Sequence, residues 1–285
     1  MKILVTGAYG QLGSEINKIS SKYNYKWVFK GHHNLDLSNL ENISDSLDSI
    51  NPEIIINCAA FTSVDNAEYD FESANILNHI SVKFIAKWCN YNNRRLIHIS
   101  TDYVYDENSE MPINEDAPTN PINNYGKTKL SGEIACVIMN PDSIIIRTSW
   151  LYSSFGDNFV KKMISLMQQK KQLNVINDQI GSPTYAADLA QAIMNIIDNN
   201  NWRPGIYNYT NLGKISWYDF ANDIKLIYGF NTIINAITTN EYPAIAKRPK
   251  YSILDKTKIK KTFNITLIPY KDSLKKCINI LKNEK

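Results

Sequence analysis

The amino-acid sequence predicts an α/β fold, a Rossmann-type doubly wound parallel sheet with a smaller, mixed C-terminal substrate-binding domain. Three observations predict it. A short β-branched strand leads directly into a glycine turn and a helix, strand and helix patterns then alternate five times, and this rhythm changes after residue 150. We therefore expect a dinucleotide-binding domain over residues 1–150 and a mainly substrate-binding domain over residues 151–285, with some later segments returning to the first domain.

The first element is a strand at residues 3–6, followed by a turn with glycines at Gly7, Gly10 and Gly13. This G-x-x-G-x-x-G spacing is a variant of the usual dinucleotide fingerprint G-x-G-x-x-G. Gly7 would permit a tight turn, Gly10 would let backbone N–H groups approach a pyrophosphate, and Gly13 would let the helix pack on the strand. The pattern predicts a nucleotide site.

The second strand, residues 26–29, ends in Lys30, and the next residues include no acid. An Asp or Glu at this point favours NAD, whereas a basic residue favours the 2′-phosphate of NADP. Lys30 therefore favours NADPH, with NADH as the alternative and an ordinary solvated basic turn as the non-functional interpretation. By its position after this turn, Asp36 is expected to meet the adenine.

Strands at residues 52–57 and 96–100 are apolar enough to be central parallel strands, separated by a helical stretch over residues 64–90. His98 lies within the second of these strands and is expected to be packed rather than catalytic. Small residues follow the first strand, where a ligand can approach closely; they include Ala59, Ala60 and Thr62. The second strand brings Ser100, Thr101 and Asp102 to the same edge of the sheet.

Tyr125 and Lys129 are four residues apart at the start of the next predicted helix, so they project from one face. A free phenol has a pKa of about 10, and we expect the ammonium of Lys129 and the helix N-terminus to lower that value. A Tyr and a Lys on an ordinary amphipathic helix would show the same spacing. The strand-end Thr101 and the glycine turn favour an acid–base function instead, with Tyr125 as proton donor.

The strand at 143–147 ends near Trp150, and the remaining elements are shorter and mixed. We expect a polar, turn-rich patch over residues 174–184, and the other expected elements are helices at 158–169, 186–197 and 217–228, a strand at 205–209, and helices starting near 255 and 271.

Composition narrows the class of partner. The formal net charge of +3 is spread along the 285 residues, so neither nucleic acid nor an anionic membrane is expected as a partner. The four cysteines form no C-x-x-C pair, which predicts reduced thiols and no zinc site. No ligands for another metal can be placed, so we expect none. The N-terminal apolar run is too short for a signal peptide, and we expect a cytoplasmic protein that acts on a small molecule.

The glycine turn, Ser100-Thr101-Asp102 and the Tyr125–Lys129 pair together resemble the extended short-chain dehydrogenase/reductases that act on nucleotide-activated sugars. Within that family, ordered segments across almost the whole chain are similar to the dTDP-4-dehydrorhamnose reductases. These segments are residues 7–13, 100–105, 125–129, 147–150, 177–184 and 248–249.

The resemblance implies reduction of the C4 keto group of dTDP-6-deoxy-L-lyxo-4-hexulose to dTDP-L-rhamnose by NADPH or NADH. It implies a catalytic triad of Thr101, Tyr125 and Lys129, substrate contacts at Thr101, Asp102 and Trp150, and a monomer or homodimer. With the residues derived above, the expected cofactor contacts are Gly7, Gly10, Gln11, Leu12, Gly13, Lys30, Asp36, Leu37, Ala59, Ala60, Thr62, Tyr125 and Lys129.

Rival activities within the family differ at identifiable residues. A nucleotide-sugar 4,6-dehydratase carries Asp-Glu after the strand-end threonine, whereas Thr101 is followed by Asp102 and Tyr103. The base needed for elimination is therefore missing, which favours simple reduction. An epimerase would retain NAD. The turn at Lys30 has no acidic residue to favour NAD, which is an argument against an epimerase. Reduction of another nucleotide-linked 4-keto-6-deoxy sugar and a non-catalytic NADP-binding regulatory subunit remain the alternatives.

Overall fold

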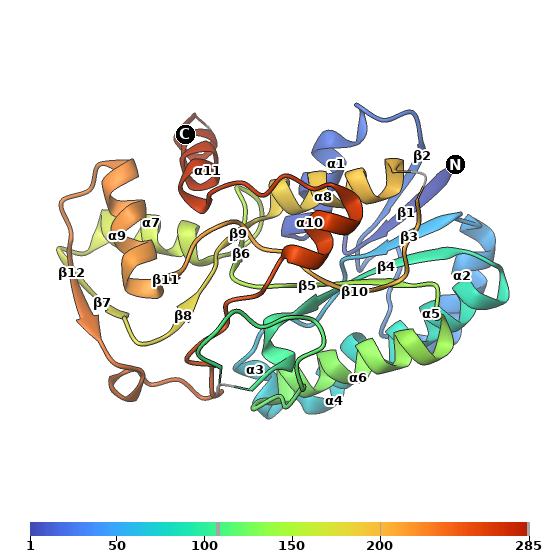
Figure 1. Cartoon of the computed structure of the whole chain (residues 1–285), viewed down its shortest axis with the longest axis horizontal. Coiled ribbons are helices and arrows are strands. Elements are labelled where there is room, and N and C mark those ends of the chain that lie inside the picture. Colours follow the sequence, from blue (N-terminus) through green and yellow to red (C-terminus); the bar gives the residue numbers. More distant parts are fainter. Residues whose placement is uncertain (107–108, 200, 284–285) are drawn as a thin grey trace.

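A six-stranded parallel sheet forms the main body of the computed structural model, which describes residues 1–106, 109–199 and 201–283 (Figure 1). The strands lie in the order β10-β5-β4-β3-β1-β2, and every neighbouring pair is parallel. The predicted Rossmann-type sheet is thus confirmed. Its strands are β1 Lys2–Thr6, β2 Lys26–Lys30, β3 Ile54–Asn57, β4 Arg95–Thr101, β5 Ile144–Thr148 and β10 Gly205–Asn208.

Helices cover both faces of this sheet (Figure 1). Ile3 and Val5 face one apolar cluster and Leu4 faces the other, because successive side chains of a strand point to opposite faces. Burying each such Leu or Ile stabilises the fold by roughly 1.5–3 kcal/mol. The first face carries α1 Gln11–Ser20, α8 Ala186–Asp198 and α10 Thr257–Phe263, and the second carries α2 Ile43–Ile50, α5 Ser81–Tyr91 and α6 Asn124–Met139.

The strand order places a crevice at the carboxyl ends of β1 and β3. From β1 the chain moves to β2 on one side and later to β3 on the other, which makes this point a topological switch. Ligands of doubly wound sheets bind at such a point. The glycine turn follows β1 and the small residues 58–60 follow β3, so both lie at this crevice.

The helical stretch predicted over residues 64–90 is interrupted, so that prediction was wrong in its continuity. Asp70 leaves the helical conformation, with φ −125° and ψ 67°, and its carboxylate accepts a hydrogen bond from the backbone N–H of Ser73. This cap ends one short helix and starts the next. The segment consists of α3 Asn66–Tyr69, α4 Phe71–Asn75, a π-helical turn η2 Ile76–Ile80, and α5.

The remaining elements form a third apolar cluster beside the sheet, on the left of Figure 1. The polar, turn-rich patch expected over residues 174–184 was wrong in part: residues 177–179 and 182–183 are irregular, but residues 172–176 form a strand that buries Leu173 and Val175 and pairs with a strand far along the chain. The helices are α7 Phe159–Gln169, α9 Trp217–Tyr228 and α11 Tyr270–Asn283. The paired strands are β7 Gln172–Ile176 with β12 Ile233–Ile237, β6 Leu151–Tyr152 with β9 Thr184–Tyr185, and β8 Ile180–Gly181 with β11 Ile215–Ser216.

Segments after residue 150 return to the main sheet. β10 pairs with β5, and α8 packs against α1. In the part of the chain that the structure describes, no helix is long and apolar enough to cross a membrane. Three single turns of 3₁₀-helix complete the fold: η1 Leu40–Asn42, η3 Asp102–Val104 and η4 Thr239–Glu241.

Candidate active site

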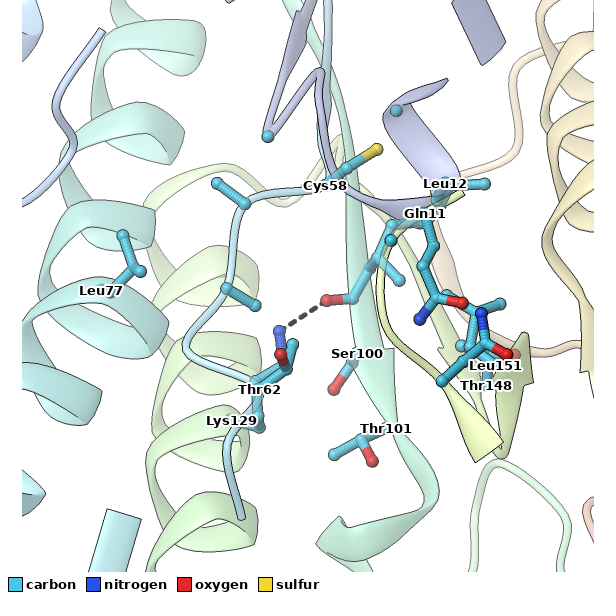
Figure 2. Close-up of a pocket in the computed structure, with 18 of the residues that line it drawn as sticks. Gln11, Leu12, Cys58, Thr62, Leu77, Ser100, Thr101, Lys129, Thr148 and Leu151 are labelled. Atoms are coloured by element: carbon cyan, nitrogen blue, oxygen red, sulfur yellow. Dashed lines mark hydrogen bonds between the residues drawn. The ribbon is translucent and has the colours of Figure 1, made fainter. Parts of the chain in front are cut away.

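A cavity of about 920 Å³ lies at the carboxyl ends of the sheet strands. Its walls are the first turn of α1, the loops that follow β3, β4 and β5, the first residues of α6, and Trp217 of α9. Figure 2 shows Gln11 and Leu12 on one side of this cavity and Lys129 and Thr62 on the other, with Ser100 and Thr101 between them. The strand ends that the sequence singled out therefore meet at one site.

Most of the predicted site residues line this cavity, but two do not. Lys30 contributes its carbonyl oxygen to the N–H of Ala8, and the carboxylate of Asp36 accepts hydrogen bonds from Ser38 and lies 3.3 Å from Nδ1 of His32. The predicted residues that line the cavity are Gly7, Gly10, Gln11, Leu12, Gly13, Leu37, Ala59, Ala60, Thr62, Thr101, Asp102, Tyr125, Lys129 and Trp150.

The glycine turn has no room for side chains at two of its three glycines. Gly7 has φ +60°, and a Cβ built on it would lie 2.7 Å from the backbone nitrogen of Ala59. A Cβ on Gly13 would lie 2.4 Å from the carbonyl oxygen of Gly7. Gly10 precedes α1 without a side-chain cap, so the N–H groups of the first helical turn point at the cavity without an intrahelical partner.

The start of α6 is fixed by a cap and by a close approach. The side chain of Asn123 accepts a hydrogen bond of 2.8 Å from the N–H of Gly126 and donates one to the carbonyl of Lys247. Gly126 packs so tightly on η3 that a Cβ there would lie 2.2 Å from the carbonyl oxygen of Tyr103. Tyr125 is thereby held against the end of β4.

Thr101 and Tyr125 both line the cavity at the end of β4, close enough for the Thr101 side chain to affect the pKa of the Tyr125 phenol. The Thr101 hydroxyl donates to Oδ1 of Asp102 at 3.1 Å and accepts from the N–H of Tyr103 at 3.2 Å. The hydroxyl is thus oriented by two neighbours. A ligand oxygen in front of this pair would meet two hydroxyl groups, which is the arrangement needed to protonate and bind one carbonyl oxygen.

The predicted lowering of the Tyr125 pKa was wrong. Burial raises the pKa of Tyr125 to about 12, the Asp102 carboxyl adds to this rise, and the hydrogen bond from Thr101 opposes it. The ring of Tyr103 packs edge to face on Tyr125 with centroids 5.7 Å apart and contributes to the burial. The phenol is therefore fully protonated at neutral pH, as a proton donor must be.

Lys129 is buried, with 1% of its surface exposed. Its Nζ donates to the carbonyl oxygen of Ile99 at 2.6 Å, the dashed line in Figure 2. Burial lowers the pKa of Lys129 to about 8, against the opposing effect of Glu133 one turn further along α6. The ammonium thus faces the cavity from beneath Thr62 and remains charged at neutral pH.

Two further residues that line the cavity are Asp102 and Trp150. Burial raises the pKa of Asp102 to about 7, against hydrogen bonds from Ser252 and Thr101. Trp150 adopts a left-handed conformation, φ +47°, that is rare for a large side chain, and stacks on Trp217 at 3.5 Å. Strain of this kind concentrates where a structure must present a side chain in one position.

Asn78 is a site-forming residue that the sequence gave no reason to select. From the π-helical turn η2, its side chain bonds both the N–H and the carbonyl of Phe61, at 2.8 and 3.1 Å, and donates to the hydroxyl of Thr128 on α6. It therefore joins the loop after β3 to α6. The π-helical geometry that aims it was not visible in the hydrophobic pattern.

Comparison with known proteins identifies the family. The family model of the RmlD substrate binding domain matches residues 1–283. The chain belongs to this family. A dTDP-4-dehydrorhamnose reductase of Aggregatibacter actinomycetemcomitans is 38% identical to this RmlD-family chain over an alignment of 285 positions. The alignment covers 96% of this chain and 97% of the relative.

Solved structures of RmlD-family relatives share the whole fold. The dTDP-4-dehydrorhamnose reductase of Clostridium acetobutylicum is 40% identical, with a TM-score of 0.95 over 99% of this chain and 100% of that one. The dTDP-4-dehydrorhamnose reductase of Bacillus anthracis, solved in complex with NADP, is 34% identical, with a TM-score of 0.93 over 98% and 99% of the two chains. The resemblance inferred from the sequence motifs is thus confirmed.

Proposed function

We propose that this chain reduces the C4 keto group of dTDP-6-deoxy-L-lyxo-4-hexulose with NADPH and forms dTDP-L-rhamnose. The names of its relatives support this substrate, and the NADP complex of the Bacillus anthracis relative supports this cofactor. The observation that carries the proposal is that Thr101 and a protonated Tyr125 line the same cavity as the glycine turn.

The residues present fit a dinucleotide. The cradle at Gly7 and Gly10 brings bare backbone to the cavity, beside uncapped N–H groups that suit a pyrophosphate. Buried oxygens of Gln11 and Ser100 have no hydrogen-bond partner within the described residues, although both residues line the cavity. Such oxygens are expected where a polar ligand completes the site. When bound, the cofactor supplies the hydride.

The side chains would divide the remaining work. Tyr125 would hold the proton that passes to the C4 oxygen. The Thr101 hydroxyl donates to Asp102 in this structure, and it would turn its single proton to the same C4 oxygen when substrate binds. Lys129 would hold the nicotinamide ribose through its ammonium. Asp102 and Trp150, at the opposite rim, would orient the sugar so that its C4 carbon faces the cofactor.

The geometry after Thr101 supports reduction over dehydration. Tyr103 occupies the position of the dehydratase glutamate, and its ring packs against Tyr125 rather than offering a base. We also propose a cytoplasmic location, which the need for NADPH and the free thiols of Cys58, Cys89, Cys136 and Cys277 support. Within the described residues, no three His, Cys, Asp or Glu side chains come together to hold a metal ion.

Purified protein tests this function. With NADPH and dTDP-6-deoxy-L-lyxo-4-hexulose, we expect loss of NADPH absorbance in step with formation of dTDP-L-rhamnose, identified by NMR. A different product configuration at C4 would instead assign the chain to another 4-keto sugar reductase. Binding of NADPH without turnover of any nucleotide-linked 4-keto sugar would refute catalysis and indicate a regulatory subunit.

A further inference from the structure

A row of polar side chains crosses three strands of the sheet beneath the cavity and ends on Lys129. Thr6 Oγ1 on β1 donates to Asn57 Oδ1 on β3 at 2.6 Å, and Asn57 Nδ2 lies 3.1 Å from His98 Nδ1 on β4. His98 Nε2 in turn lies 3.5 Å from Lys129 Nζ. No member of the row is more than 2% exposed.

The sheet register places these side chains side by side. Thr6 is directly opposite Asn57, and Asn57 is directly opposite His98. One pleat earlier on the same face, the corresponding row is the apolar set Leu4, Ile55 and Leu96. On this face of the sheet, the side chains are therefore apolar until the last row before the cavity, where they are hydrogen-bonding groups.

The three strand members of the row lie at or near the point where their strands lead into a wall of the cavity. Thr6 immediately precedes Gly7, Asn57 immediately precedes Cys58, and His98 is two residues before Ser100. The row therefore joins the bases of three loops to the amine of Lys129. A buried polar group is stable only when its partners are in place, so displacement of one member disturbs the next.

The imidazole of His98 is suited to hold position rather than to carry charge. Burial, together with the nearby Lys129 ammonium, keeps the pKa of His98 well below its usual value, so the ring is neutral. Lys129 Nζ donates to the carbonyl oxygen of Ile99 and lies 3.5 Å from Nε2 of this ring. A neutral ring that accepts at Nε2 carries its proton on Nδ1, so the Asn57 amide must turn its oxygen toward Nδ1. Ile99 and His98 both belong to β4, the strand that delivers Thr101.

We propose that Asn57 and His98 are positioning residues that hold the Lys129 amine in register with the cofactor loops. This inference rests on the proposed function, because it gives Lys129 the task of holding the nicotinamide ribose. Neither residue touches the cavity contents in this arrangement. Their effect on NADPH must pass through Lys129, and that requirement makes the proposal testable.

A double-mutant cycle on NADPH affinity tests it. Alone, His98→Phe keeps the ring volume, removes both nitrogens, and should weaken NADPH binding about tenfold, or ~1.4 kcal/mol. In a Lys129→Met background, the same substitution should change the dissociation constant less than about twofold, because the residue it acts through is already absent. Dissociation constants come from quenching of protein fluorescence by NADPH.

Matched variants separate positioning from general stability. His98→Gln retains nitrogen and oxygen groups near both partners and should recover most of the affinity. Ile145→Ala, directly opposite His98 on β5, should lower the melting temperature while leaving NADPH affinity within about twofold of wild type. Should His98→Phe fail to fold, Asn57→Leu supplies the same cycle, because it removes the hydrogen-bonding groups of the next member of the row.

Two results would overturn the inference. One is a His98→Phe protein that binds NADPH as tightly as wild type, and the other is an equal loss of affinity with and without Lys129. Both are measured without sugar. A wild-type protein that binds NADPH but reduces no 4-keto sugar would refute the proposed function separately, and the affinity cycle would still decide whether the row acts through Lys129.

Discussion

Tyr125 and Thr101 line one cavity at the end of β4, in a setting that raises the pKa of the Tyr125 phenol to about 12. A phenol with that pKa is protonated at neutral pH. Tyr125 therefore has a proton to give to a carbonyl oxygen, which is the transfer that accompanies hydride addition in a reduction.

Tyr125→Phe should remove this proton while preserving the packing against Tyr103. We expect kcat to fall roughly 10²- to 10⁴-fold, as for loss of a general acid, with NADPH affinity nearly unchanged. Steady-state kinetics and NADPH titration measure the two effects. Tyr152→Phe is a matched control, because its buried hydroxyl has no partner within the described residues and does not line the cavity. Full activity in Tyr125→Phe would eliminate it as the donor.

Gly13→Ala and Gly10→Ala should separate folding from cofactor binding. A Cβ on Gly13 meets backbone atoms at 2.4 and 2.6 Å, so we expect the free energy of unfolding to fall by about 1–3 kcal/mol. A Cβ on Gly10 has no contact closer than 3.3 Å, so the fold should tolerate it, whereas the added methyl group narrows the cradle. We expect Gly10→Ala to weaken NADPH binding about tenfold. Urea denaturation and NADPH titration of both variants check this, and equal affinity in Gly10→Ala would contradict the placement of the pyrophosphate.

Asp102 should make stability depend on pH in a defined window. Its pKa rises from 3.8 to about 7 on folding, so between these values the folded protein holds a proton that the unfolded chain has lost. The Asp102 carboxyl therefore adds its full contribution to the free energy of unfolding below about pH 4, and this contribution is lost as the pH rises through 7. Asp102→Asn removes this dependence. Between pH 5 and pH 8, the free energy of unfolding of wild type should fall by on the order of 2–3 kcal/mol more than that of the variant, as measured by urea unfolding. Parallel curves for the two proteins would show that Asp102 is charged in the folded state.

The sequence was sufficient to predict Thr101, Tyr125 and Lys129 as one site because two local rules determine their meeting. Carboxyl ends of parallel strands share an edge, and residues four apart share a helix face. The pKa of Tyr125 could not be predicted in the same way. It depends on burial by Tyr103 and by the segment near Lys247, whose approach is set by a contact across 124 residues.

The other differences also come from distant partners. β7 was not predicted because its partner β12 lies about 60 residues later, and its polar Asn174 and Asn177 suggested a turn. Asn78 gained its importance from a π-helical turn against which Gly132 packs so closely that a Cβ there would lie 2.1 Å from the Asn78 carbonyl oxygen. Local sequence contains neither contact.

Arg147 and Glu133 form a buried ion pair, and we expect the protein to be destabilised when only one of the two is removed. Their side chains are 3% and 2% exposed, joined at 2.6 Å, and connect β5 to α6 one turn after Lys129. Removing one partner leaves a buried charge, so Arg147→Met should destabilise the protein by about 3–5 kcal/mol. Adding Glu133→Leu should recover much of this loss, which denaturant unfolding of the single and double variants measures. A double variant less stable than the single one would show that the pair itself is stabilising.

Gly181→Ala should test the role of Trp150 without changing either indole. A Cβ on Gly181 would lie 2.4 Å from the Trp150 ring, which Trp217 covers on stacking at 3.5 Å, so the indole must move. Because misplacing a positioning group by about 1 Å can cost up to about 10²-fold, we expect KM for the dTDP sugar to rise roughly 10- to 100-fold. NADPH affinity should not change, since a Cβ on Gly181 meets the Trp150 ring and no residue of the glycine turn. Tryptophan fluorescence reports whether the stacked pair has shifted. A clear fluorescence change with an unaltered KM would show that Trp150 does not contact the sugar, and the strained left-handed backbone at this residue would then serve the packing of α9 alone.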